Sequence, residues 1–312
     1  MNTATLHLPI LTMSSIHNLD MMYSLTIAGV RLFIQSDREI KVNKAFEPFL
    51  FSLSSNLQDS FDYHITIQTV SSLSPAGVPQ KISEDYFEFS VNGQIERLYF
   101  DRRSKDHPYL LAKYNWTGRS IILSVLPEGK EYICEFSNLF FHLALEQIFY
   151  RESKFYLHAV FIQTMDGALL FSGPSGVGKT TLSRYWIQQF GGDVLNGDRT
   201  ILEWKENHLI GWGSPYAGSS KIYKNKSARI CYFIKLKQGL TTSIRTLHGF
   251  EAYQAVYSAM TVSTQDRYFI ERASKFAEKL AKSIPILELT TVNNPSSAIE
   301  LHHYLSERKS HV

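Results

Sequence analysis

An octapeptide in the middle of the chain, Gly-Pro-Ser-Gly-Val-Gly-Lys-Thr at positions 173–180, constrains the fold more than any other feature of the sequence. It matches the pattern G-x-x-x-x-G-K-[ST], follows the apolar run Ala168–Phe171 and precedes a stretch free of glycine and proline. Glycines lack a Cβ, so such a loop can curl until its backbone N–H groups point inward at an anion. The order of strand, glycine-rich loop and helix therefore predicts an α/β domain that binds phosphate.

The residues of this segment have expected roles in binding ATP and Mg²⁺. The positive end of the helix dipole faces the phosphates, the Lys179 ammonium reaches the β- and γ-phosphates, and the Thr180 hydroxyl ligates magnesium. The predicted nucleotide-binding residues are Gly173, Pro174, Ser175, Gly176, Val177, Gly178, Lys179, Thr180 and Thr181. The alternative is a glycine-rich turn that binds no ligand.

The chain of 312 residues is long enough for about two domains, and its two parts differ in pattern. Residues 1–135 alternate short apolar runs with turn residues, as in Tyr63-His-Ile-Thr-Ile and around Asn92-Gly93, which predicts a β-rich domain. Residues 136–312 are expected to form the phosphate-binding catalytic domain. The predicted fold class is therefore a mixed α/β (α+β) architecture.

A helix is expected over residues 136–150, where Phe136, Phe140, Leu143 and Phe149 recur near helical spacing. Beyond it, strands are predicted at 155–164, 168–172, 193–195, 200–204, 208–212, 229–237 and 286–290. Helices are predicted at 179–190, 249–260, 265–282 and 296–307. The first two of these strands flank Met165-Asp-Gly167, which predicts a β-hairpin leading directly into the glycine-rich loop.

The order Leu157-His158-Ala159, hairpin, glycine-rich loop, helix and Val194-Leu-Asn-Gly-Asp198-Arg199 resembles the catalytic domain of the HPr kinase/phosphorylase family, which includes kinases of lasso-peptide clusters. The resemblance covers about residues 150–237. The stretch Gly-Lys-Thr-Thr-Leu-Ser at 178–183 is also similar to ATP-dependent phosphoenolpyruvate carboxykinase, which shares that nucleotide-binding fold. The activity that the resemblance implies is phosphorylation of a serine, and not the carboxykinase reaction.

In that family a histidine before the loop and an aspartate pair after the next strand form the active site, and His158 and Asp198 occupy the matching positions. The implied catalytic residues are Asp198, His158 and Lys179, with Thr180 and Asp198 as metal ligands. Asp198 can hold magnesium and polarise the incoming hydroxyl, while His158 can relay the proton or orient Asp198. The alternatives are a turn-forming aspartate and a buried core histidine.

The sequence departs from the family pattern in places that bear on the substrate. Gly197 replaces the first aspartate, Thr181 replaces the usual glutamate, and the C-terminal third lacks a match to the HPr-binding segment. HPr is therefore not expected as the acceptor, and a peptide or small protein, including a ribosomally made peptide precursor, is the expected partner. Relatives often form oligomers, which leaves a homo-oligomer open. The loop 211–220 and the cations after it either close over the substrate or form a solvated surface segment.

Composition narrows the range of possible partners, locations and functions. A net charge of +3 is too small to imply a nucleic-acid or membrane partner, and the lack of an 18-residue apolar run favours a cytoplasmic protein. Cys134 and Cys231 are too far apart to suggest a zinc site or a disulfide framework. The sequence thus predicts an ATP- and Mg²⁺-dependent serine kinase. The alternatives are a nucleotide-responsive regulatory binding protein, which Gly197 favours, and a small-molecule kinase.

Overall fold

The computed structural model describes residues 21–52, 61–91, 94–101, 104–262, 267–292 and 294–309. The chain divides into two compact units. Unit 1 comprises the described residues up to Ser24 together with Arg31–Lys41 and Ser52–Leu143. Unit 2 comprises Leu25–Val30, Val42–Phe51 and the chain from Ala144 onward. The two units are described separately below.

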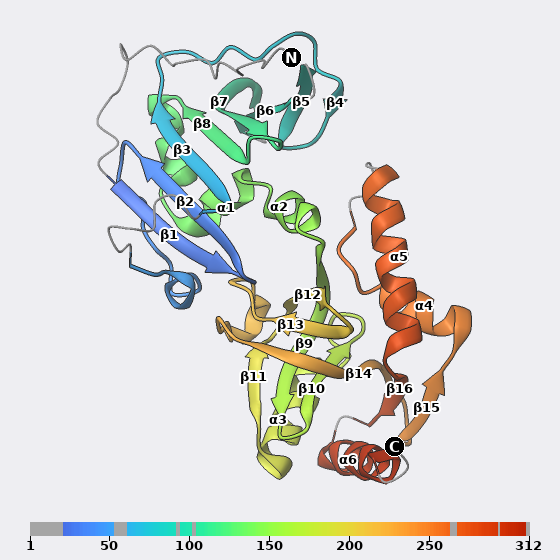
Figure 1. Cartoon of the computed structure of the whole chain (residues 1–312). Helices are drawn as coiled ribbons and strands as arrows, with labels where there is room; N and C mark the ends of the chain where they lie inside the picture. Colours follow the sequence, from blue (N-terminus) through green and yellow to red (C-terminus); the bar gives the residue numbers. More distant parts are fainter. Residues whose placement is uncertain are drawn as a thin grey trace, which may run out of the picture. The chain divides into compact units, whose positions relative to one another are not determined.

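A sheet of eight strands forms the body of unit 1, with the strand order β1-β2-β3-β8-β7-β6-β5-β4 (Figure 1). The strands are β1 (Met21–Ile27), β2 (Val30–Ser36), β3 (Tyr63–Thr69), β4 (Lys81–Ile82), β5 (Tyr86–Val91), β6 (Gln94–Asp101), β7 (Ser104–Asn115) and β8 (Ser120–Val125). β3 pairs in parallel with both β2 and β8, while β5 to β8 pair antiparallel. The predicted β-rich N-terminal region is confirmed, and Asn92-Gly93 itself lies outside the described residues.

The predicted helix at 136–150 is wrong in one respect, because two short helices replace it. α1 spans Phe136–His142 and α2 spans Leu145–Arg151. Between them Ala144 adopts a left-handed conformation with φ of 51°, which interrupts the i to i−4 hydrogen bonding of a helix. Leu143 and Leu145 are both buried beside this break, so hydrophobic spacing continues although the helix does not.

Unit 2 is built on a second sheet of eight strands, in the order β10-β9-β12-β13-β14-β16-β15, with β11 also pairing β9. The strands are β9 (Lys154–Thr164), β10 (Gly167–Ser172), β11 (Asp193–Asn196), β12 (Arg199–Lys205), β13 (His208–Trp212), β14 (Ser227–Gln238), β15 (Ser243–Leu247) and β16 (Ile286–Thr291). Long strands β9 and β14 each pair with several neighbours, and the pairings β9–β12–β13–β14–β10–β9 close on themselves. The predicted mixed α/β fold class is confirmed.

Most predicted elements of unit 2 agree with the structure, including the hairpin of β9 and β10. The helices after the loop are α3 (Lys179–Phe190), α4 (Gly249–Tyr257), α5 (Arg267–Ser283) and α6 (Pro295–Lys309). The sequence analysis missed β15, a five-residue strand that pairs with β16 along one edge only. A short strand of mixed polarity carries little periodic signal, so its pairing with β16 decides its conformation.

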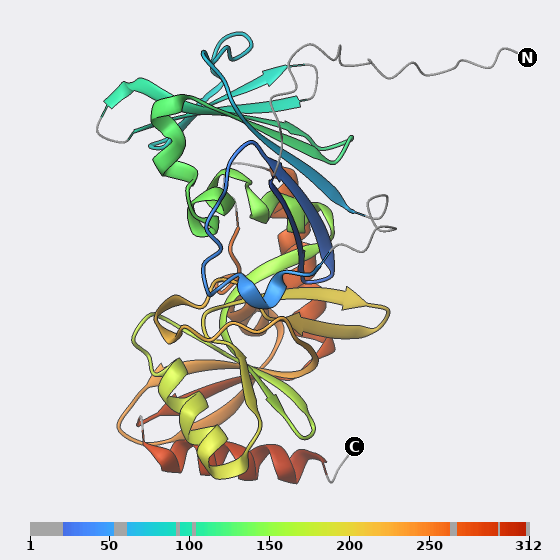
Figure 2. The same cartoon turned by 90° about the vertical axis from the view of Figure 1, so that its left-hand side faces the viewer.

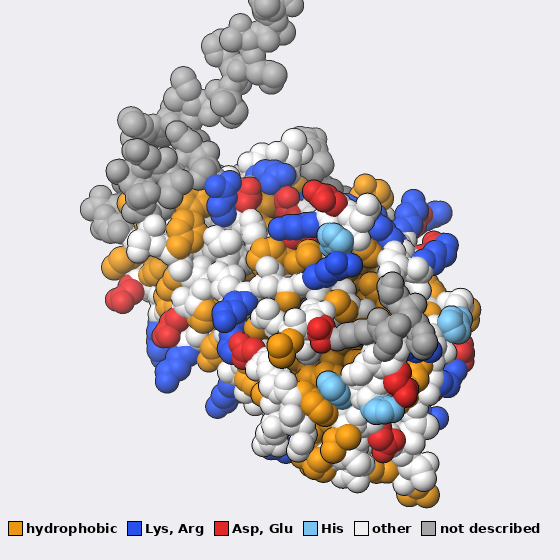
Figure 3. Space-filling view, turned by 60° about the horizontal axis from the view of Figure 1, so that its bottom comes forward, with side chains coloured by type: hydrophobic (Ala, Val, Ile, Leu, Met, Phe, Trp, Pro, Cys, Tyr) orange, Lys and Arg blue, Asp and Glu red, His pale blue; other side chains and the backbone are white. Residues whose placement is uncertain are grey.

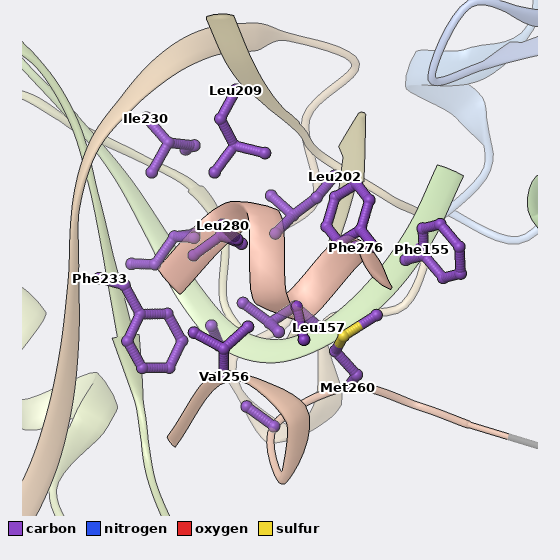
Figure 4. Close-up of a cluster of buried hydrophobic side chains, with 14 of the residues drawn as sticks. Phe155, Leu157, Leu202, Leu209, Ile230, Phe233, Val256, Met260, Phe276 and Leu280 are labelled. Carbon is purple, nitrogen blue, oxygen red and sulfur yellow. The ribbon is translucent and has the colours of Figure 1, made fainter. Parts of the chain in front are cut away.

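Hydrophobic layers cover both faces of this sheet. On one face Phe155, Leu157 and Phe161 of β9 pack with α4 and α5, whose Val256, Phe276 and Leu280 join the cluster shown in Figure 4. On the other face Val160 and Ile162 of β9 pack with α3 and α6. Successive residues of β9 thus enter opposite cores, which explains its almost continuous apolar sequence.

Helices α3 and α6 lie side by side on this second face (Figures 1 and 2). Trp186 and Phe190 of α3 form ring contacts with His302 of α6, and the Phe190 and His302 rings stack with centroids 3.9 Å apart. Figure 3 looks toward the bottom of Figure 1, where α3 and α6 lie, and shows charges of both signs scattered among hydrophobic side chains. Because α3 begins directly after the glycine-rich loop, its packing against α6 holds the C-terminal end of that loop in place.

Candidate functional site

The glycine-rich loop lies between β10 and α3, as the sequence predicts. Gly173, Gly176 and Gly178 have φ values of 145°, 77° and 106°, a region that residues with a Cβ avoid. A Cβ at Gly173 would also lie 2.9 Å from the carbonyl oxygen of Leu236 and 3.0 Å from a methyl group of Val177. The loop therefore needs glycine at 173 both for its backbone conformation and for its close approach to β14.

The loop stands at a position suited to an anion. β10 pairs in parallel with β14, which pairs in parallel with β16, and the loop follows the carboxyl end of β10. Ligands of α/β sheets commonly bind beyond the carboxyl ends of parallel strands. Helix α3 begins after Gly178 without a capping side chain and without an acidic residue in its first turn. Its first N–H groups and its dipole are thus directed at the loop.

The side chain of Lys179 folds back onto the loop. Its side chain is buried, and Nζ donates hydrogen bonds to the carbonyl oxygens of Gly173 at 2.8 Å and Pro174 at 3.1 Å. Val177 is buried in the core beside α3, while Ser175, Gly176 and Thr180 are exposed. The ammonium is therefore held within the ring of the loop, where a phosphate would meet both the charge and the backbone amides.

Strand pairing brings His158 and Asp198 together. β9 pairs antiparallel with β12 so that His158 lies opposite Arg199, and the N–H of Ala159 donates to the carbonyl oxygen of Asp198 at 2.9 Å. His158 Nδ1 is 3.1 Å from Asp198 Oδ1, and Arg199 Nε is 4.0 Å from Asp198 Oδ2. The side chains of His158 and Asp198 are 42% and 26% exposed, so both can meet a ligand.

The charges of the loop and of this pair influence one another. Burial lowers the pKa of the Lys179 ammonium, and the negative charge of Asp198 acts in the opposite direction. Burial also lowers the pKa of His158, the positive charges of Lys179 and Arg199 lower it further, and Asp198 opposes them. These effects together favour the neutral form of the His158 imidazole, and Lys179, His158 and Asp198 share one electrostatic environment.

The sequence analysis missed Asn196, which organises the turn before Asp198. Asn196 is fully buried, and its Oδ1 accepts the backbone N–H groups of Asp198 at 2.9 Å and Arg199 at 2.8 Å. Its Nδ2 donates to the carbonyl oxygens of Ser214 at 2.9 Å and Tyr216 at 3.1 Å. The signal in the sequence was the Asn-Gly-Asp triplet, in which the asparagine side chain makes the turn.

The cations after the 211–220 loop divide into two sets. Lys224 and Lys226 both face Asp193 of β11, and Lys224 makes an ion pair with it. Lys221 is exposed and follows the short 3₁₀ turn Gly218–Ser220. Lys224 and Lys226 are thus neutralised in part within the chain, which supports the surface interpretation for this part of the segment.

Fold and site together define an α/β domain with a P-loop at the carboxyl end of a parallel strand and a His–Asp pair within electrostatic reach of the P-loop lysine. No family model matches the chain, and no curated protein matches it in sequence. Among solved structures, the chain is similar to the Hpr(Ser) kinase/phosphatase from Coxiella burnetii, with 15% identity and a TM-score of 0.30 over 50% of this chain and 93% of that chain. A similarity at this score carries no argument about function.

Two further observations concern ligands and membranes. In the part of the chain that the structure describes, no group of three His, Cys, Asp or Glu side chains is arranged to hold a metal ion. Across the same residues, none of the helices combines the length and the apolar character needed to cross a membrane.

Proposed function

We propose that this protein is a cytoplasmic, ATP- and Mg²⁺-dependent kinase that transfers the γ-phosphoryl group to a serine hydroxyl of a peptide or small protein, such as a ribosomally made peptide precursor. The observation that carries the proposal is the contact of His158 Nδ1 with Asp198 Oδ1 at 3.1 Å, beside a P-loop whose carbonyl oxygens hold the Lys179 ammonium. A phosphate-binding loop alone fits any nucleotide-binding protein. A basic group and a carboxylate beside it provide what an acceptor hydroxyl requires.

The residues present fit a magnesium nucleotide. Thr180 is exposed in the first turn of α3, where a hydroxyl ligates magnesium in P-loop proteins, and Asp198 is the carboxylate whose charge acts on Lys179. The loop amides and Lys179 would bind the β- and γ-phosphates. Magnesium, when bound, would neutralise phosphate charge during transfer, and Thr180 and Asp198 are the residues that would hold it.

The His158–Asp198 pair suits removal of the acceptor proton. An ionised carboxylate only accepts hydrogen bonds, so a hydrogen between Asp198 Oδ1 and His158 Nδ1 belongs to the imidazole, and Nε2 is then its basic atom. As the acceptor oxygen bonds to the γ-phosphorus, the bond from that phosphorus to the β–γ bridging oxygen breaks and ADP leaves. The hydroxyl proton passes to His158, while Asp198 orients the ring and stabilises the imidazolium.

Unit 1 supplies a means of holding an extended peptide. Among its described strands, β1 and β4 stand at the two edges of the sheet, and Met21, Met22 and Ile82 of these strands are exposed. An edge strand offers unpaired backbone groups to which a peptide can add as a further strand. We therefore assign substrate recognition to unit 1 within this proposal.

The test is incubation of the protein with ATP, Mg²⁺ and peptides encoded beside its gene, followed by mass spectrometry for an added phosphoryl group. We expect a phosphoserine product from the wild type and a loss of about 100-fold or more in Lys179→Ala. Phosphate on a metabolite instead of a peptide would indicate a small-molecule kinase. ATP binding without any phosphorylated product would contradict the kinase and indicate a nucleotide-responsive regulatory protein.

A further inference from the structure

Position 197 is closed to any side chain. A Cβ at Gly197 would overlap the Oγ and the Cβ of Ser220, so the Ser220 side chain fills the space that a side chain at 197 would need. Ser220 is itself held in place, because its Oγ donates to the carbonyl oxygen of Ala217 at 2.6 Å and accepts the N–H of Ile222 at 3.2 Å. The absence of a second carboxylate next to Asp198 is therefore built into the packing of the loop.

The same loop passes directly beside the remaining carboxylate. Gly218 has a φ of 53°, and a Cβ there would lie 2.9 Å from Cγ of Asp198. The backbone N–H of Gly197 donates to the carbonyl oxygen of Ile222 at 3.2 Å, and Tyr223 forms an isolated β-bridge with Asn196, so the turn is tied to the segment that follows the loop. Each segment thus places a glycine against a side chain of the other segment, Gly197 against Ser220 and Gly218 against Asp198, with no room for a Cβ at either position.

The side chain of Asn196 is hydrogen-bonded to both segments. Its Oδ1 holds the N–H groups of Asp198 and Arg199, and its Nδ2 holds the carbonyl oxygens of Ser214 and Tyr216. All four bonds are made by one side chain that is completely buried. The amide of Asn196 is shielded from water, which therefore cannot replace these partners, so the arrangement fixes the direction in which Asp198 leaves the turn.

We infer that Asn196 is a positioning residue for phosphoryl transfer, and that residues 213–223 form a wall that fixes Asp198 against His158 as the single carboxylate of the site. This inference rests on the proposed function and specifies how its catalytic pair is held. The P-loop is not part of this wall, because the hydrogen bonds of the wall run between residues 196–199 and 214–222. Its loss lowers kcat and leaves the KM for ATP nearly constant.

The test is a two-residue cycle of Gly197→Ala, Ser220→Gly and their combination. Gly197→Ala pushes the turn away from Ser220, and we expect kcat to fall about 10- to 100-fold, since a displacement of about 1 Å at a reacting group has such an effect. Ser220→Gly removes both atoms that the new Cβ would meet, leaving the carbonyl oxygen of Ala217 as its next neighbour at 3.5 Å. The double variant is expected to recover most of the lost kcat. The KM for ATP is expected to stay nearly constant throughout the cycle, whereas a general loss of structure would change it together with kcat.

Backbone amide hydrogen exchange gives a readout that does not require turnover. Asn196 Oδ1 accepts the N–H groups of Asp198 and Arg199, so displacement of the turn in Gly197→Ala is expected to speed the exchange of these two amides, and the double variant is expected to restore it. If the wild type makes no phosphorylated product, the proposed function fails and amide exchange alone decides the inference. Unchanged exchange of both amides in Gly197→Ala overturns it.

Asn196→Ala provides an independent arm, with Asn294→Ala as its matched control. Asn294 is an exposed asparagine whose Oδ1 likewise accepts a backbone N–H, that of Ser296 at the start of α6. We expect Asn196→Ala to lose kcat at least about 10-fold with the KM for ATP unchanged, and Asn294→Ala to retain wild-type kcat. Equal kcat in both variants overturns the role of Asn196. If Asn196→Ala does not fold, the cycle at positions 197 and 220 still decides the inference.

Discussion

The contact between Asp198 and His158 can be tested by removing the negative charge of Asp198. Asp198→Asn keeps the shape of the side chain and eliminates the negative charge 3.1 Å from His158 Nδ1. Because that charge raises the pKa of His158 against the effects of burial, Lys179 and Arg199, the substitution lowers the pKa of His158 further below its ordinary value of 6.5. The variant histidine is therefore harder to protonate than the wild-type one.

The size of the effect follows from the distance and the exposure of the two groups. His158 is 42% exposed, so the medium between the charges is close to water and not to a protein interior. Coulomb's law at 3.1 Å in such a medium gives about 1.3 kcal/mol, which corresponds to about one pKa unit. We expect the pKa of His158 to decrease by that amount at low salt and by less at about 1 M salt, where ions screen charges even at such short distances.

The assay is NMR titration of the imidazole proton resonances, with His158→Gln used to identify the His158 signal among the 11 histidines. In parallel, kcat of Asp198→Asn should fall about 100- to 10,000-fold, as expected for loss of general-base assistance, while ATP binding measured by calorimetry stays near that of the wild type. A His158 pKa that stays constant or rises in Asp198→Asn would refute the contact, and with it the assignment of the base.

Two further predictions concern stability. Gly173→Ala should reduce the free energy of unfolding by about 1–3 kcal/mol more than Gly176→Ala, because both sites have positive φ but only a Cβ at 173 would contact the backbone of Leu236. Urea denaturation followed by tryptophan fluorescence compares the two variants. Equal losses of stability would contradict the packing argument. Burial lowers the pKa of His142 to about 4, so the unfolded chain binds more protons and about 3 kcal/mol of stability is lost as pH falls from 6.5 to 4. His142→Phe should abolish that slope in a series of melting temperatures, and an unchanged slope would exclude His142 as its origin.

Local sequence determined the elements whose signals are contiguous. The P-loop was predictable because its glycines, Lys179 and the strand and helix beside it lie within one short segment, and positive φ at glycine is a local property. The break at Ala144 was not predictable, because an alanine in a left-handed conformation has no sequence signal and the apolar spacing continues through it. The strand β15 was missed because only its neighbour β16 gives it a partner.

The sequence by itself thus determined a mixed α/β chain with a phosphate-binding loop at Gly173–Thr180. Only the tertiary structure decided what stands beside that loop. The register of β9 against β12 brings His158 to Asp198, and the buried Asn196 joins their turn to a loop that fills position 197. The backbone conformation of the glycine-rich loop is a property of its own residues, whereas strand register and the closeness of two loops depend on how distant segments pack, which spacing along one chain does not encode.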